Sequence, residues 1–136
     1  MRVQSHIPEV KARLRESVQN GFRAMGSWLA AALQARVGYQ TGPDGPPSPP
    51  GTAPFRRTGA GQESIGYQMI EDGVRVGVEF GLAMPYKRGT KQISAGEYMI
   101  LHDQGDAPGG IKRPWLSDWR IYAPEMASVF MSAAKS

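Results

Sequence analysis

The stretch from Glu97 to Asp106 holds the residues best suited to chemistry. It places His102 beside Asp103, with Asp106 in the same turn. A histidine next to carboxylates suits a general base, and the carboxylates could gather around a hard divalent cation. Neither pattern is complete, because the chain lacks a G-x-S-x-G nucleophile elbow, a helical H-E-x-x-H pair and the calcium-loop spacing. We expect a structural or solvated His102, with a small hydrolase or metal enzyme at His102 and Asp103 as a rival interpretation.

Cofactor-binding patterns are also incomplete. There is no Walker motif, and the glycines of RRTGAGQES (56–64) do not follow a predicted strand as a dinucleotide-binding turn requires. The absence of cysteine excludes disulfides and thiolate metal sites, and it fits a reducing cytoplasm. The sequence therefore predicts no catalytic residues, no cofactor and no metal, in a protein that is not an enzyme.

The charge pattern permits contact with nucleic acid without requiring it. Sixteen Lys and Arg residues against twelve Asp and Glu residues give a net charge of +4. These bases are scattered, whereas phosphate binding usually needs a concentrated patch. A basic DNA-binding or packaging accessory protein is the alternative function, and it would use five bases: Lys87, Arg88, Lys91, Lys112 and Arg113.

Membrane and secretory signals are not found in the sequence. No apolar run approaches the roughly 20 residues that span a bilayer. The N-terminus becomes charged and helical at once, unlike a signal peptide. We expect a protein that is soluble and intracellular when synthesised.

A long amphipathic helix is predicted from Pro8 to Val37, with Gly38 as its stop. Its apolar residues recur at steps of three and four: Ile7, Val10, Leu14, Val18, Phe22, Met25, Leu29, Leu33 and Val37. Gly21 and Gly26 predict a bend or a break in the middle. At about 45 Å the helix would overhang the core, so it either crosses the back of a sheet or packs its end on another subunit.

A β-hairpin is predicted around Asp72-Gly73, a strong signal for a two-residue type I′ turn. This turn would set Glu71 opposite Val74, Met69 opposite Val76, Tyr67 opposite Val78 and Ile65 opposite Phe80. One face of the hairpin would then be apolar and would receive the long helix, while the other would carry polar residues and glycines.

The remaining segments complete a single α+β domain over residues 1–136. A proline-rich loop (38–57) and a basic loop (81–96) are expected to be irregular. A further strand is predicted from Glu97 to His102. A C-terminal helix is predicted from Ser117 to Ala134, with Ser117 as N-cap and Pro124 causing a kink or a start near Ala123. Trp115 is expected in the core. The long helix would thus pack on a small antiparallel sheet made of the hairpin and the further strand.

Three pieces of the chain, in this order, carry a family resemblance. The first is PFRRTGAGQESI, with Arg57, Thr58, Gly59 and Ser64; the second is YMILHDQGD, with Tyr98, His102 and Gly105; the third is KRPWLSDW, with Arg113, Pro114, Trp115 and Leu116. Together they resemble the minor tail, or tail-completion, family of long-tailed bacteriophages and prophages.

The resemblance implies a structural virion protein of the phage neck or tail. Such a protein would form a homo-oligomeric ring, with a hexamer as one candidate, that completes the tail tube and joins it to the head. Its implied partners are the tail tube or tail terminator protein and the head connector or head-closure protein, with non-specific DNA contact and no membrane. It would assemble in the host cytoplasm. The candidate interface residues are Arg57, Thr58, Tyr86, Lys87, Arg88, Lys91, Arg113 and Trp119.

Overall fold

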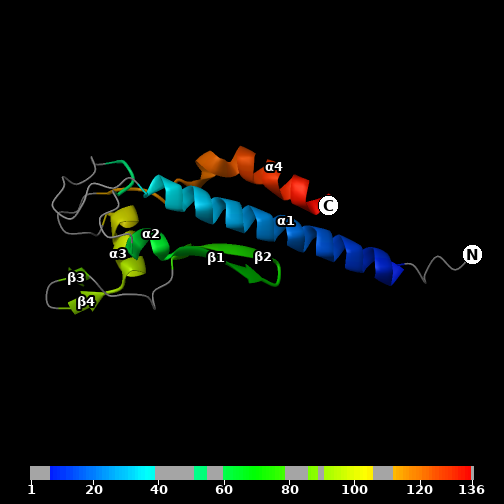
Figure 1. Cartoon of the computed structure of the whole chain (residues 1–136), viewed down its shortest axis with the longest axis horizontal. Coiled ribbons are helices and arrows are strands. Elements are labelled where there is room, and N and C mark those ends of the chain that lie inside the picture. Colours follow the sequence, from blue (N-terminus) through cyan, green and yellow to red (C-terminus); the bar gives the residue numbers. More distant parts are fainter. Residues whose placement is uncertain are drawn as a thin grey trace, which may run out of the picture.

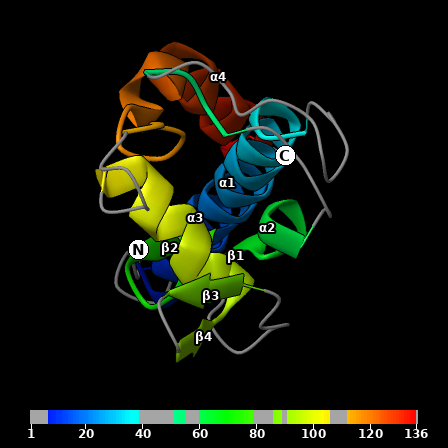
Figure 2. The same ribbon diagram turned by 90° about the vertical axis from the view of Figure 1, so that its left-hand side faces the viewer.

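The computed structural model describes residues 7–38, 51–54, 60–78, 86–88, 91–105 and 112–135. Its elements are α1 (Ile7–Arg36), α2 (Ala60–Glu63), β1 (Ile65–Ile70), β2 (Gly73–Val78), β3 (Tyr86–Arg88), β4 (Lys91–Ile93), α3 (Ala95–Gln104), the 3-10 helix η2 (Trp119–Tyr122) and α4 (Ala123–Ala134). Helix α1 lies between the β1–β2 hairpin on one side and α4 on the other (Figures 1 and 2). The predicted α+β fold, with its long N-terminal helix, antiparallel sheet and C-terminal helix, is confirmed.

Helix α1 is one unbroken helix of 30 residues, so the predicted break at its glycines is wrong. Both glycines are buried because neighbouring elements approach the helix closely there. A Cβ on Gly21 would lie 2.6 Å from Phe130 Cε2 of α4, and one on Gly26 would overlap Val74 of β2. The glycines therefore let α4 and the hairpin pack directly on the backbone of α1.

The core lies around the C-terminal half of α1. Leu33 and Trp115 have no exposed surface, which confirms the predicted core position of Trp115. The other buried apolar members of this cluster are Leu29, Ala30, Val37, Ile65, Met99 and Met126. Two side-chain amides fix the junction of α1 with β1, since Gln34 Nε2 donates to Ile65 O and Gln62 Nε2 donates to Gln34 O, both at 2.8 Å.

The β1–β2 hairpin forms with the predicted faces but with a different register. Ile65 pairs with Val78, Tyr67 with Val76 and Met69 with Val74, a shift of two residues from the prediction. No residue from Glu71 to Gly73 has a positive φ, so the turn is not type I′. Gly73 is instead a buried strand residue beside Phe22 of α1. A two-residue shift preserves side-chain alternation, which explains why the faces were right.

Two predicted segments between the hairpin and the C-terminus are wrong. Residues 81–96 are not one loop, because β3 and β4 form a second antiparallel hairpin in which Tyr86 pairs with Ile93, both good strand formers. The predicted strand Glu97–His102 is helix α3. The side chain of Ser94 accepts a hydrogen bond from Glu97 N, and Gly105 closes the helix in the left-handed conformation at φ 84°.

The C-terminal helix begins at Ala123, with Pro124 in its first turn, as one of the two predicted outcomes has it. Ser117 is not its N-cap, because the single 3-10 turn η2 precedes it and Tyr122 occupies the cap position. Phe130 packs edge-on against Phe22 of α1, with ring centroids 5.1 Å apart. Of the proline-rich loop, residues 39–50 and 55–57 lie outside the described residues, while Gly51 N donates to Lys112 O at 3.0 Å.

Replacing Gly26 by alanine is expected to destabilise the fold. An open helical Gly→Ala change stabilises by about 1 kcal/mol, but the overlap with Val74 should reverse the sign and cost about 1–2 kcal/mol. Urea unfolding measures this difference. Ser27→Ala, at the exposed neighbouring position, is the control and should change the free energy of unfolding by less than about 0.5 kcal/mol. A more stable Gly26→Ala protein would contradict this packing.

Candidate functional site

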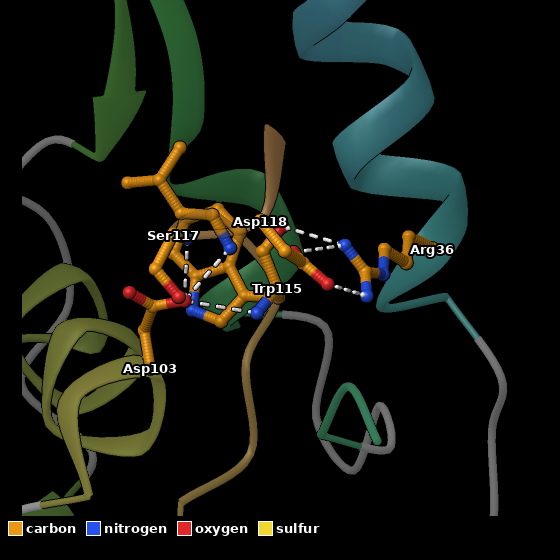
Figure 3. A network of polar contacts seen from close by, with 6 residues as sticks. Arg36, Asp103, Trp115, Ser117 and Asp118 are labelled. Atoms are coloured by element: carbon orange, nitrogen blue, oxygen red, sulfur yellow. Dashed lines mark hydrogen bonds and ion pairs between the residues drawn. The ribbon is translucent and has the colours of Figure 1, made fainter. Parts of the chain in front are cut away.

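The residues singled out for chemistry lie on α3, where Asp103 anchors another part of the chain. The Asp103 side chain is buried, and its Oδ1 accepts hydrogen bonds from three successive backbone N–H groups. The donors are Trp115, Leu116 and Ser117, at 2.9, 2.8 and 2.9 Å (Figure 3). Buried backbone N–H groups are costly when they have no acceptor, and the Asp103 carboxylate supplies an acceptor for three of them. The geometry gives Asp103 a structural role.

The neighbourhood of His102 offers little for hydrolysis or metal binding. The His102 ring is buried and stacks edge-on against Tyr98, with centroids 4.4 Å apart. Within the described ranges, no three His, Cys, Asp or Glu side chains are grouped so that they could hold a metal ion. Asp106, which the sequence places in the same turn as His102 and Asp103, lies outside the described residues. The rival enzyme interpretation therefore gains no support from this geometry.

Trp115 links the same segment to α3 through a second set of contacts. Its indole Nε1 donates to Met99 O at 2.7 Å, and Arg113 N donates to His102 O at 2.8 Å. With the Asp103 bonds, these contacts fix residues 113–117 along one side of α3. We call this arrangement the Asp103 clamp.

An ion pair connects the far end of the clamped segment to α1. Arg36 Nη1 and Nη2 donate to the two carboxylate oxygens of Asp118 at 2.5 and 2.6 Å (Figure 3). The hydrogen bond from Arg36, with its charge, lowers the pKa of Asp118, and the hydrogen bond to Asp118 raises the pKa of Arg36. Arg36 Nη1 also lies 3.4 Å from Trp115 O. The Arg36–Asp118 ion pair therefore connects the C-terminal end of α1 to the residue that precedes η2.

The predicted interface residues do not form one site in the described structure. Arg57 and Thr58 lie outside the described residues. Tyr86, Lys87 and Arg88 lie on β3, and Lys91 lies on β4, so the basic positions are on a hairpin rather than a loop. The remaining two are Arg113, which is buried, and Trp119, which is 39% exposed. Trp119 thus stays a surface candidate, whereas Arg113 does not.

The interface residues predicted from the sequence do not include the N-terminal part of α1, which is a larger exposed surface. Every residue from 7 to 16 of α1 is exposed, and the helix extends past both the hairpin and α4 (Figure 1). Its apolar stripe, which we define as Ile7, Val10, Leu14 and Val18, is 43–61% exposed. The heptad-like spacing revealed the stripe from sequence, but only the fold shows that no other described element covers it.

Charged side chains flank the apolar stripe. The exposed bases are Lys11, Arg13 and Arg15, and the exposed acids are Glu9 and Glu16. Where the stripe meets the hairpin tip, a cleft of about 630 Å³ opens between Leu14 and Val18 on α1 and Met69 to Gly73 on the hairpin. This N-terminal part of α1, residues 7–18, is called the overhang below. An apolar stripe with charged flanks is typical of a protein-binding helix.

Comparisons with known proteins give no family assignment: the chain matches no family model, no curated protein and no solved structure. None of the described helices is both long and apolar enough to cross a membrane. The candidate site therefore rests on the geometry above, in which the exposed apolar stripe of α1 is the main feature.

Removing the Asp103 carboxylate is expected to destabilise the protein strongly. Asp103→Ala leaves three backbone N–H groups without their acceptor and should cost about 3 kcal/mol of unfolding free energy. Asp103→Asn keeps an acceptor oxygen and should lose about half as much. Thermal and urea unfolding measure both, with Glu16→Ala on exposed α1 as the control. An Asp103→Ala protein as stable as the control would contradict the clamp.

The Arg36–Asp118 pair should stabilise the protein in a pH-dependent manner. Since the pKa of Asp118 is lowered on folding, its contribution is present above the ordinary value of 3.8 and is lost as pH falls through the lowered pKa. Asp118 is over a third exposed, so water weakens the pair and a coupling of about 1 kcal/mol is expected near neutral pH. A double-mutant cycle with Arg36→Ala and Asp118→Ala measures it. A coupling that stays constant down to the acid limit would contradict this assignment.

Proposed function

We propose that this protein is a structural component of the neck or tail of a long-tailed bacteriophage or prophage. It assembles as a ring that completes the tail tube and joins it to the head connector. Two kinds of support meet in this proposal. The motifs around Arg57, Tyr98 and Arg113 resemble the tail-completion family, and the overhang provides an exposed apolar surface for self-association.

The observation that carries the proposal is the exposed apolar stripe. Four large apolar side chains lie in a row on one helix face and are exposed to water. Burying this surface against a partner would be favourable by about 25 cal/mol for each Å² of apolar surface removed from water. Contiguous apolar patches of this kind mark interaction surfaces in soluble proteins. The ten exposed residues from 7 to 16 make a helical segment of about 15 Å.

The basic DNA-binding alternative is weaker on this structure. Arg113, one of its five proposed bases, is buried, and its backbone N–H is bonded to α3. Lys112 is exposed beside it. Indifference of the protein to DNA, or binding that does not weaken with salt, would remove this alternative.

Breaking the stripe should prevent assembly without unfolding the protein. Light scattering of the wild-type chain, alone and mixed with tail-tube or connector protein, should give a ring-sized species in at least one condition. Leu14→Glu places a carboxylate in the stripe and should leave a monomer of 14.8 kDa. Its unfolding temperature should stay near that of the wild type, because Leu14 is 61% exposed.

Ala12→Glu is the matched control for the Leu14 variant. It adds the same charge to the same turn but two residues away, about 200° around the helix and at an exposed position. This control should assemble like the wild type. A wild-type chain that stays monomeric with every structural partner would contradict the proposed function.

A further inference from the structure

The face of the β1–β2 hairpin that points away from α1 has an unusual hollow. Gly66 and Gly77 lie directly opposite each other on the two strands. A Cβ built on either glycine would meet nothing within 4 Å. The hollow has a volume of about 630 Å³ and is lined by residues 63–68 and 75–78, with no residue of α1 or α4.

Nothing within the described chain requires glycine at these two positions. Neither residue has a positive φ, and no neighbouring atom would clash with a side chain. Glycine weakens a strand, and in strand interiors it often marks a site where another backbone approaches closely. Gly21 and Gly26 already serve that purpose inside the fold, where α4 and β2 press on α1. The Gly66–Gly77 pair also lacks side chains, but no neighbour among the described residues fills the space beside it.

The overhang of α1 is about as long as the outer face of the hairpin. Residues 7–18 make a helix of about 18 Å, and the six-residue strands of the hairpin extend about 20 Å. The centre of the outer face can cover the stripe of the overhang, because Gly66 and Gly77 place no polar side chain there. A helix placed on a sheet face without Cβ atoms can approach more closely than on an ordinary strand.

The charges of the two surfaces also correspond. The overhang exposes three bases, Lys11, Arg13 and Arg15, and two acids. The hairpin and its entrance expose three acids, Glu63, Glu71 and Asp72, and one base, Arg75. The acids lie at the two ends of the hairpin, whereas Arg75 lies on the face itself, so unlike charges predominate at the rim of the proposed contact.

We propose that the overhang of one copy docks on the outer face of the β1–β2 hairpin of a second copy. Each hairpin is then covered by its own α1 on the inner face and by a neighbour's α1 across Gly66 and Gly77. The two surfaces differ, so the contact is head-to-tail and propagates from copy to copy until it closes into a ring. This inference rests on the proposed function, because it names the surfaces through which that ring forms.

Filling the hollow tests the inference. Gly77→Val should leave the monomer as stable as the wild type or more so, since the position is open and valine favours strands. It should nevertheless abolish assembly as completely as Leu14→Glu does. Ala31→Val, at an exposed position on the other half of α1, controls for the added apolar surface and should assemble normally.

Mixing the two defective chains distinguishes a head-to-tail contact from a symmetrical one. Neither Leu14→Glu nor Gly77→Val assembles alone, but the mixture retains one intact overhang and one intact hairpin face. Native mass spectrometry should show a heterodimer containing one chain of each kind. Normal assembly of Gly77→Val, or a mixture that stays monomeric, would overturn the inference. The proposed function would survive the first of these results but not a wild-type chain that never assembles.

Cross-linking gives a second readout, because the natural chain has no cysteine. Leu14→Cys mixed with Gln68→Cys, a residue of the outer hairpin face, should form a disulfide-linked dimer on oxidation. Ala12→Cys mixed with Gln68→Cys should not. Equal yields from the two mixtures would mean random collision and would overturn the docking.

Discussion

The buried carboxylate of Asp103 is the constraint on which the described fold depends. By accepting three backbone N–H groups, it fixes the segment from Trp115 to Ser117 against α3. This places the Trp115 ring in the core cluster that also contains Leu33 of α1. The same segment presents Asp118 to Arg36, so α1, α3 and the entrance to α4 are joined at one point. Loss of this anchor would leave α4 without a fixed starting position.

Holding α1 at one end has a direct consequence for function. The hairpin, α4 and the clamp pack along α1 from about Leu14 to its C-terminal end, and Gly21 and Gly26 allow close contact there. The N-terminal residues extend beyond them as a rigid helix with an exposed apolar stripe. A firmly anchored helix that protrudes can present this stripe to a neighbour without paying for its ordering on association. The same anchoring that stabilises the monomer therefore equips it for assembly.

Much of this architecture was predictable, because local signals and tertiary packing agree. The period of α1 and the alternating faces of the hairpin were evident in the sequence, and Pro124 indicated the start of α4 near Ala123 as one of two outcomes. Helix α3 was mistaken for a strand because its short apolar run fits either period. Its caps were the better evidence, since Ser94 and Glu97 have capping-box spacing and Gly105 marks the end. The Asp103 clamp and the paired glycines depend on long-range contacts, which one sequence does not reveal.

The central claim is that the overhang of α1 is covered by another copy of the chain. Hydrogen exchange of residues 7–18, measured by mass spectrometry below and above the concentration at which the protein assembles, tests it most directly. The account predicts that exchange in this segment slows markedly on assembly, together with exchange in the β1–β2 hairpin, while α3 is unchanged. Equal exchange of the overhang in monomer and assembly would contradict the account.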